Sequence, residues 1–335
     1  MNLFLITIDG GTTNTRATLW NREYQPVCTA KREVGVRDTA IDGNNQRLKE
    51  AVKGLIEELL SGGGVSMGQV SAVYASGMIT SNVGLSELPH LNAPASMEDF
   101  VKGVRSVSLP EVCPLPIHLI PGLKNLPDEK VTLETLEAMD IMRGEEAEAL
   151  ALLSCIDNRD GCLLVLPGSH TKFVTVDRHG AMTGCLTSLA GEMLSALTQH
   201  SIVADAVQRQ FVSGACDLAY LTAGFRAARA TSCARAAFLV RIANQFITKD
   251  QNQCASFLLG AVLENDVSAI RTSRALCVNP KMQVLIAGKE PLKTAIKSLL
   301  VEDGYFSKVS AFNPPDEKPL AGYGALLIAK EKGDF

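Results

Sequence analysis

The stretch IDGGTTNTRATLW, residues 8–20, places two glycines and two threonines between two runs of residues typical of β-strands. Asp9 precedes the glycines and Arg16 follows the threonines. Glycines let a ligand approach the backbone closely, and free N–H groups beside hydroxyls can bind phosphate. Turns rich in glycine and threonine also occur in ordinary hairpins. The stretch alone therefore leaves two interpretations open, a hairpin turn and a phosphate-binding turn.

A second copy of this pattern lies in the other half of the chain. Residues 162–166 form an apolar run, residues 167–172 (PGSHTK) form a turn, and strand-like runs follow at 173–176 and 181–187. The two turns align without gaps, and the second adds a lysine. The repeat favours phosphate binding, because two such turns can hold a polyphosphate from both sides. The predicted phosphate-binding residues are Gly10, Gly11, Thr12, Thr13, Gly168, Ser169, His170, Thr171 and Lys172.

Strands and helices alternate along the rest of the chain. Helices are predicted where apolar residues recur at helical spacing, and strands where short apolar runs are bounded by turn residues. Strands are predicted over residues 3–8, 16–20, 26–34, 71–75, 117–120, 162–166, 173–176, 181–187, 283–287 and 306–310. Helices are predicted over residues 45–60, 145–156, 189–207, 223–247, 253–272, 292–300 and 320–330. This pattern predicts two α/β domains that face each other across a cleft.

The composition narrows the class of protein. The chain has 335 residues, of which 46% are hydrophobic and 20% charged, so it can bury a large core. Its net charge of -4 does not favour nucleic-acid binding, which usually needs a basic face. No apolar run reaches the length of a transmembrane helix, and the first residues lack the basic region of a signal peptide. We therefore expect no nucleic acid and no membrane among its partners.

The number and spacing of the cysteines indicate the cellular compartment of the protein. There are nine, an odd number, and no two are spaced as Cys-x-x-Cys. Neither a disulfide framework nor a zinc site is expected. Buried free thiols are typical of a reducing environment, so the predicted location is cytoplasmic.

Candidate chemistry also lies at the start of a predicted helix, in the segment MRGEEA, residues 142–147. Glu145 and Glu146 either stabilise the helix dipole or provide a general base that accepts the proton of an acceptor hydroxyl in phosphoryl transfer. Arg143 fits either a structural ion pair or a partner for an anionic substrate.

Two other segments are candidates for the wall of the cleft. Gly77 and Met78 follow a predicted strand, and their loop either lines the cleft or makes no ligand contact. Glu192 is either a helix-capping acid or a cleft residue. The chain has no Gly-x4-Gly-Lys-Ser/Thr motif, and no Gly-x-Gly-x-x-Gly follows a strand, which argues against a P-loop NTPase and a dinucleotide dehydrogenase.

Several motifs together resemble the sugar kinase, Hsp70 and actin superfamily. Residues 9–16 are similar to its first phosphate motif, residues 167–172 to its second, residues 284–288 to its adenosine motif and residues 321–325 to its last connecting helix. Within it, the chain is most similar to the 2-dehydro-3-deoxygalactonokinase family. That resemblance rests on the ordered combination of residues 77–79 (GMI), 142–146 (MRGEE), 166–172 (LPGSHTK), 191–192 (GE) and 200–201 (HS). Gly10 stands where the family usually has an aromatic residue, and the aromatic residues expected near Leu85 and His90 are absent.

The resemblance implies two ribonuclease H-like domains with a cleft between them, as in actin-like ATPases. The domains are expected over residues 1–145 and 146–335, the second with a helical insertion and a final helix, 320–330, that bridges back to the first. The implied activity is an ATP-dependent kinase, with ATP and Mg²⁺ as cofactors. It phosphorylates the 6-hydroxyl of a small sugar acid, 2-dehydro-3-deoxy-D-galactonate, in galactonate breakdown.

The residues then take the following expected roles. Asp9 organises Mg²⁺, which usually takes only one or two carboxylates and keeps several waters. Glu145, ranked before Glu146, is the base. Gly288 and Lys289 lie near the adenosine. The residues expected to contact the sugar acid are Arg16, Gly77, Met78, Arg143 and Glu192.

Other functions stay open at this point. One is an ATP-binding sensor or degenerate kinase of the same superfamily. Another is a kinase for a different 2-keto-3-deoxy sugar acid, since galacto and gluco configurations differ by one or two hydrogen bonds. A third is an ATPase or phosphatase that transfers phosphate to water. The oligomeric state, including a homo-oligomer, is open as well.

Overall fold

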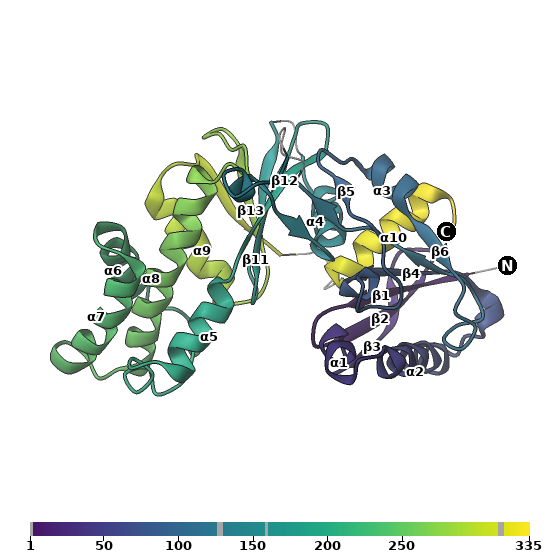
Figure 1. The fold of residues 1–335 in the computed structure, drawn as a ribbon, viewed down its shortest axis with the longest axis horizontal. Helices are drawn as coiled ribbons and strands as arrows, with labels where there is room; N and C mark the ends of the chain where they lie inside the picture. Colours follow the sequence, from purple (N-terminus) through teal and green to yellow (C-terminus); the bar gives the residue numbers. More distant parts are fainter. Residues whose placement is uncertain (1–2, 126–129, 158–159, 314–317) are drawn as a thin grey trace.

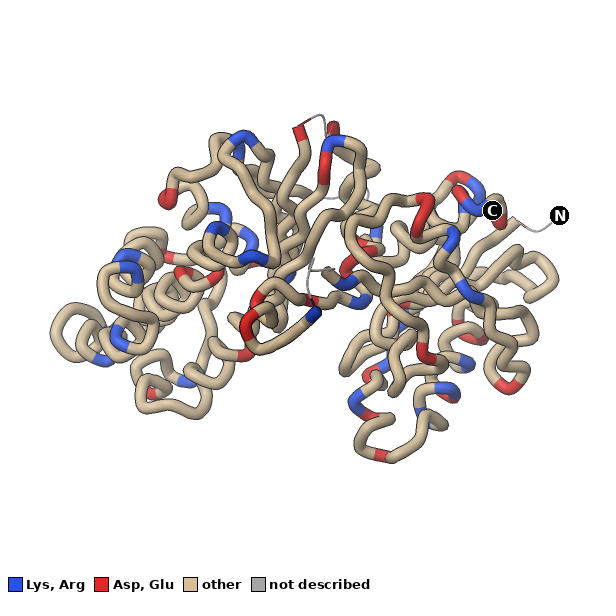
Figure 2. Tube along the Cα trace, turned by 45° about the horizontal axis from the view of Figure 1, so that its top comes forward, with Lys and Arg blue, Asp and Glu red and all other residues tan. Residues whose placement is uncertain are grey.

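The chain folds into two main β-sheets with helices on their faces (Figure 1). The computed structural model describes residues 3–125, 130–157, 160–313 and 318–335. Charges of both signs are interspersed over both halves of the molecule (Figure 2), as the small net charge leads one to expect. The α/β class predicted from the sequence is confirmed.

The first sheet has six strands in the order β3-β2-β1-β4-β7-β6. They are β1 (Phe4–Gly10), β2 (Thr15–Asn21), β3 (Pro26–Arg32), β4 (Val70–Gly77), β6 (Arg105–Val107) and β7 (Ile117–Leu119). β1, β2 and β3 form an antiparallel meander, and β4 pairs with β1 in parallel. Helix α2 (Gln46–Gly63) packs on β2 and β3, and α10 (Leu320–Lys332) packs on β1 and β4. Leu5 and Ile6, which point to opposite faces, are both fully buried in separate clusters with these helices.

The second sheet repeats this topology with five strands in the order β12-β11-β10-β13-β14. They are β10 (Cys162–Leu166), β11 (Thr171–Val176), β12 (Met182–Ser188), β13 (Gln283–Ala287) and β14 (Lys308–Phe312). β10, β11 and β12 again form an antiparallel meander, and β13 pairs with β10 in parallel. The order β11-β10-β13 thus matches β2-β1-β4, which confirms the repeat predicted from the two turns.

A small third sheet connects the halves. It contains β5 (Leu91–Asn92), β8 (Leu123–Lys124) and β9 (Ile141–Met142). Strands β8 and β9 contact β12 of the second sheet. None of these short strands was predicted, because two-residue strands leave no periodic signal.

The remaining helices follow the predicted positions with two additions, α1 and α3. They are α1 (Val36–Asp42), α3 (Met97–Gly103), α4 (Glu145–Leu153), α5 (Ala190–His200), α6 (Leu218–Ala230), α7 (Cys233–Phe246), α8 (Gln251–Thr272) and α9 (Leu292–Asp303). Short 3-10 turns occur at η1 (Met67–Gln69), η2 (Met78–Thr80) and η3 (Leu136–Ala138). Within the described parts of the chain, no helix combines the length and the apolarity that crossing a membrane requires.

Two predicted helices were wrong in their extent. The helix predicted over 223–247 is split into α6 and α7, and Ser232 begins the second by accepting a hydrogen bond from Arg235 N at 3.2 Å. The helix predicted over 189–207 ends at His200, after which Gln208 and Arg209 adopt the left-handed conformation, with φ of 51° and 53°. Non-glycine residues rarely adopt that conformation, so this connection is held by its surroundings.

The final helix packs on the first half of the chain. Helix α10 contacts α3, α4, β1 and β4. A Cβ on Gly324 would overlap the carbonyl oxygen of Ala147 in α4, so the two helix backbones are in contact. The Tyr323 ring lies 6.1 Å from that of Trp20 in β2. These contacts support the predicted bridge, while the domain limits 1–145 and 146–335 stay a prediction.

Candidate active site

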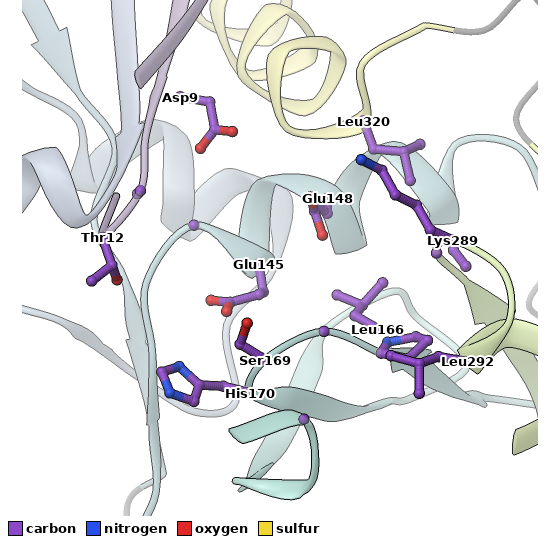
Figure 3. A pocket seen from close by; sticks show the side chains of 18 of the residues that line it. Asp9, Thr12, Glu145, Glu148, Leu166, Ser169, His170, Lys289, Leu292 and Leu320 are labelled. Atoms are coloured by element: carbon purple, nitrogen blue, oxygen red, sulfur yellow. The ribbon is translucent and has the colours of Figure 1, made fainter. Parts of the chain in front are cut away.

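A cavity of about 860 Å³ lies between the two main sheets and is lined by both glycine-containing turns (Figure 3). Most of the residues predicted for the site contribute to its wall. They are Asp9, Gly10, Gly11, Thr12, Arg16, Gly77, Met78, Arg143, Glu145, Gly168, Ser169, His170, Gly288 and Lys289. The predicted residues that do not line it are Thr13, Glu146, Thr171, Lys172 and Glu192.

Glycines form the floor beside the first turn. Gly10 at the end of β1 lies opposite Gly77 at the end of β4. Gly77 has φ of 90°, and a Cβ there would come within 2.6 Å of the Gly10 carbonyl oxygen. A Cβ on Gly10 would lie 2.5 Å from the Cβ of Ile79, which is fully buried. The space that an aromatic residue after Asp9 would need is therefore taken by Ile79.

Asp9 occupies the wall of the cavity at the carboxyl end of β1. It faces Arg16 across the hairpin, with 3.8 Å between the carboxylate and the guanidinium. Burial raises the pKa of Asp9 to about 6, Arg16 lowers it in part, and Glu145 raises it further. The effect of burial on the pKa of Asp9 is thus larger than the effect of its ion pair with Arg16.

The two adjacent glutamates at the start of α4 have different surroundings. Glu145 lines the cavity, and its carboxylate accepts a hydrogen bond from Arg143 N at 3.2 Å. Glu146 has no exposed surface, and its two oxygens accept from Gly144 N at 2.9 and 2.7 Å. Burial, and secondarily the charge of Glu145, raise the pKa of Glu146 to about 8. Glu145 is therefore the one that can reach a ligand in the cavity.

Burial of Glu146 makes stability depend on pH. The folded-state pKa of about 8 lies above the usual value for glutamate, so ionisation during a rise in pH from about 4.5 to 8 favours the unfolded chain. We expect Glu146→Gln to be more stable than the wild type at pH 8, by about 1–2 kcal/mol because burying the amide offsets part of the gain. The gain should disappear near pH 4.5, as followed by urea unfolding across this range.

A matched control for this effect is Glu57→Gln on α2, where the side chain is exposed. Its substitution neither buries nor uncovers a polar group, so it should change the free energy of unfolding by less than about 0.5 kcal/mol. Equal stability of Glu146→Gln and wild type at every pH would show that Glu146 ionises without penalty in the folded protein.

A third carboxylate, Glu148, also lines the cavity. Burial raises its pKa to about 8, with further contributions from Asp9 and Glu145 and an opposing one from Arg16. Figure 3 shows Asp9, Glu145 and Glu148 presented to the same space. Glu148 was missed from the sequence, although its position three residues after Glu145 places both on one helix face.

The carboxylates fit a bound magnesium ion without forming a closed metal site. Within the residues that the structure describes, no three histidine, cysteine or acidic side chains cluster as metal ligands. Mg²⁺ does not need such a cluster, since it binds one or two carboxylates together with phosphates and water. Burial is the main cause of the raised pKa values of Asp9 and Glu148, and it disfavours their charged forms more than Arg16 favours them. A cation bound beside these carboxyl groups would favour the charged forms.

The second turn packs against the start of α5. A Cβ on Gly191 would overlap the carbonyl oxygen of Gly168, so the helix begins directly on the turn. His170 lines the cavity, and its Nε2 lies 2.6 Å from Oε1 of Glu192, which does not line it. Glu192 is therefore placed to orient His170 rather than to touch a ligand directly.

Lys172 is directed away from the cavity. Its ammonium group donates to the carbonyl oxygen of Ile141 at 3.2 Å and to the hydroxyl of Thr187 at 2.7 Å, and the residue is only 8% exposed. The lysine that made the second turn resemble a phosphate cradle thus joins β11 to β9 and β12. The cationic side chain that this turn itself offers the cavity, when protonated, is His170.

Arg143 holds the loop that follows β4. Its Nη1 donates to the carbonyl oxygen and hydroxyl of Thr80 at 2.8 and 2.6 Å, and its Nη2 donates to Leu88 O at 2.9 Å. Nη2 also lies 3.2 Å from Nδ1 of His90. Burial, together with Arg143 and Lys124, lowers the pKa of His90 to about 4, so its neutral ring can accept this bond.

These contacts predict a structural cost for Arg143→Lys. A lysine cannot reach all four acceptors, so the Leu88 carbonyl loses the Arg143 donor, and the Thr80 carbonyl keeps only its bond from Leu88 N. We expect unfolding free energy to fall by about 2 kcal/mol, measured by urea denaturation. Arg16→Lys is the control, because Arg16 lines the same cavity but is 54% exposed, and its effect should stay within about 0.5 kcal/mol. Full stability of Arg143→Lys with weaker substrate binding would instead favour a ligand role.

The far end of the cavity was only partly predicted. Gly288 and Lys289 line it as expected, with Gly288 packed so that a Cβ would lie 3.0 Å from Cγ of Pro167. Sequence patterns gave no signal for the other residues here. They are Leu194, Ser195, Thr198, Gln199, Phe211, Glu290, Pro291 and Leu292.

Known proteins match the chain over most of its length. A family model described as 2-keto-3-deoxy-galactonokinase matches residues 9–312. The 2-dehydro-3-deoxygalactonokinase of Escherichia coli (strain K12) is 26% identical over 268 residues, which cover 79% of this chain and 80% of the relative.

Solved structures show the same fold. A Sinorhizobium meliloti protein assigned as a 2-dehydro-3-deoxygalactonokinase superposes with a TM-score of 0.75 and 18% identity, covering 98% of this chain and 99% of its own. The activator of 2-hydroxyisocaproyl-CoA dehydratase from Clostridium difficile, solved with bound ADPNP, gives a TM-score of 0.51 and 12% identity, with 99% and 96% coverage. The fold is therefore that of the actin-like ATPases, with two ribonuclease H-like domains and a cleft between them.

Proposed function

Because the chain belongs to the 2-keto-3-deoxy-galactonokinase family, we propose that it phosphorylates the 6-hydroxyl of 2-dehydro-3-deoxy-D-galactonate with ATP, in the breakdown of galactonate. It is a kinase, a phosphotransferase with an alcohol group as acceptor. The position phosphorylated, the sugar acid and the pathway are the proposed part.

The observation that carries this proposal is the position of Glu145. Its carboxylate and the two glycine-containing turns line one cavity, so a base and two phosphate-binding backbones face the same space. Phosphoryl transfer needs little covalent help from a protein, and catalysis comes from positioning and charge stabilisation. A carboxylate beside the phosphate site can accept the proton of the attacking hydroxyl.

The nucleotide side of the site is assigned as follows. Residues 10–12 of the first turn and residues 168–170 of the second offer backbone N–H groups and hydroxyls to the β- and γ-phosphates. Asp9 would hold Mg²⁺, which when bound neutralises charge on the phosphates. Gly288 and Lys289 lie toward the adenosine.

The acceptor side lies along the first half of the chain. Glu145 takes the proton from the sugar hydroxyl. Arg16, which faces Asp9 and lines the same cavity, is the cation for the substrate carboxylate or the phosphate being transferred. Gly77 and Met78 form the wall that contacts the sugar acid, and Arg143 holds their loop in place. Closure of the two halves on both substrates would exclude water that otherwise hydrolyses ATP.

A coupled kinase assay with Mg-ATP and a panel of 2-keto-3-deoxy sugar acids tests the proposal. We expect the galacto-configured acid to give the highest kcat/KM, with a product that carries phosphate on O6 by NMR. A higher kcat/KM with another acid would support the alternative substrate. ATP binding without any transfer would support a sensor or degenerate kinase, and rapid hydrolysis without an acceptor would support an ATPase or phosphatase.

The proposed function also predicts what the protein binds and where it is located. Its partner would be a small sugar acid, and its expected location is the cytoplasm, where ATP and reduced thiols coexist. All nine cysteines lie in the described residues and are free thiols. Whether a homo-oligomer forms is a question for the measured molecular mass.

A further inference from the structure

One face of α5 forms a continuous wall of the cavity. Gly191, Leu194, Ser195, Thr198 and Gln199 line it at the spacing of a single helix face. The face starts against the second turn at Gly191 and reaches Gln199 about two turns later, about 12 Å along the helix axis. An extended nucleoside diphosphate covers a comparable length from its terminal phosphate to its base. With phosphates at the turn, the base therefore lies beside Gln199.

The walls at this end suit a purine ring. Leu194 from α5, Phe211 from the connection after it, and Pro291 and Leu292 at the start of α9 line the cavity here. Apolar and aromatic walls with a few polar groups are typical of nucleotide-base pockets, and the face of Phe211 can stack on a ring. Polar side chains at this end come from Ser195, Thr198, Gln199 and Glu290. Of the three on α5, Gln199 lies farthest along the helix from the second turn.

The amide of Gln199 has a fixed orientation. Its Nε2 donates to the carbonyl oxygen of Arg209 at 2.7 Å, and the Arg209 guanidinium donates back to the carbonyl oxygen of Gln199 at 2.8 Å. A carbonyl oxygen only accepts, so the amide cannot flip without losing this bond. Gln208 and Arg209 are both left-handed, which holds that carbonyl in place at a cost in backbone strain.

We propose that Gln199 selects a nucleotide with a 6-aminopurine base. The remaining amide oxygen, Oε1, can only accept, and no described residue donates to it. The 6-amino group of adenine is a donor and satisfies it, whereas the 6-oxo group of hypoxanthine or guanine places a second acceptor against it. This inference rests on the proposed kinase function and adds the residue that reads the base.

The test compares ATP with ITP, which differ at the 6-position of the base. We expect the wild type to prefer ATP by about tenfold to a hundredfold in kcat/KM, the effect of one unpaired polar group. Gln199→Met keeps the size of the side chain and removes the acceptor, so the preference should fall to within about threefold. The KM for the sugar acid should change little, because Gln199 lies about two helical turns along α5 from the second turn.

Gln46→Met on α2 is the matched control, since Gln46 is exposed and does not line the cavity. It should keep the full preference for ATP. Equal use of ATP and ITP by the wild type, or an unchanged preference in Gln199→Met, would overturn the inference while leaving the kinase function intact.

Nucleotide-binding measurements test the role of Gln199 independently of kinase activity. If no nucleotide supports phosphotransfer, the proposed function fails, and calorimetry with ADP and IDP then decides the role of Gln199. Tighter binding of ADP that Gln199→Met abolishes would support the inference. Equal binding of ADP and IDP, or binding of neither, would overturn it.

Discussion

Replacing Glu145 with glutamine is expected to lower kcat for sugar-acid phosphorylation by about a hundredfold to ten-thousandfold, the range that general-base catalysis contributes. Glutamine keeps the size of the side chain and can still accept the hydrogen bond from Arg143 N that positions it. It cannot accept the proton of the attacking hydroxyl. Steady-state assays should show the loss in kcat, and calorimetry should show that the affinity for ADP changes little.

The neighbouring Glu146→Gln variant is the control, because it applies the same substitution one residue further along the helix. Glu146 is fully buried, and its raised pKa of about 8 keeps it mostly protonated at neutral pH, so glutamine resembles its native state. Its kcat should stay within a few-fold of the wild type. Full activity of Glu145→Gln together with loss in Glu146→Gln would reverse the assignment of the base.

Gly324→Ala is expected to destabilise the protein by about 3–5 kcal/mol, although it adds only one methyl group. The new Cβ would overlap the carbonyl oxygen of Ala147, which is helix backbone and cannot rotate away. Helices α4 and α10 would have to separate, which would also displace Glu145 at the start of α4. Urea denaturation and kcat should both report the change.

The same substitution at Gly54 should have the opposite sign. Gly54 lies in the interior of α2, and a Cβ there would meet no atom within 4 Å. Alanine should therefore stabilise by about 0.5–1 kcal/mol, since it restricts the unfolded chain and favours the helix. A Gly324→Ala variant as stable as Gly54→Ala would contradict the close contact between α4 and α10.

The duplicated sheet start could be predicted because its signal is local. Each copy combines an apolar run, a short turn and two more strands within a few tens of residues. The helix ends at His200 and Ala230 could not be predicted from the spacing of apolar residues. Val203 and Val207 continue the apolar pattern of α5 and are buried in the core of the second half, but they belong to the connection that follows the helix. Periodicity reports burial and cannot tell a helix from a folded connection.

In the candidate site too, features with a local sequence signal could be predicted, and features set by distant contacts could not. The turns could be located from their small residues, but the direction of a side chain is set by contacts across the fold. Lys172 is the second residue of β11, and its ammonium group donates to the Ile141 carbonyl and the Thr187 hydroxyl. No sequence pattern near Lys172 indicates these two contacts. The choice between Glu145 and Glu146 depends on Gly144, whose φ of 115° sets how the helix begins. The proposed role of Gln199 in selecting the base could not be predicted from the sequence, because it depends on the connection at Gln208 and Arg209, which has unusual backbone angles.

The contact between α10 and the first sheet has a consequence for synthesis of the protein on the ribosome. Leu5 and Trp20 share a buried cluster with Leu326 and Ile328, which are synthesised about 300 residues later. Chains are made from the N-terminus and domains usually fold as they emerge. One face of the first sheet therefore stays uncovered until α10 has been made, and the emerging polypeptide exposes apolar surface that a chaperone can bind.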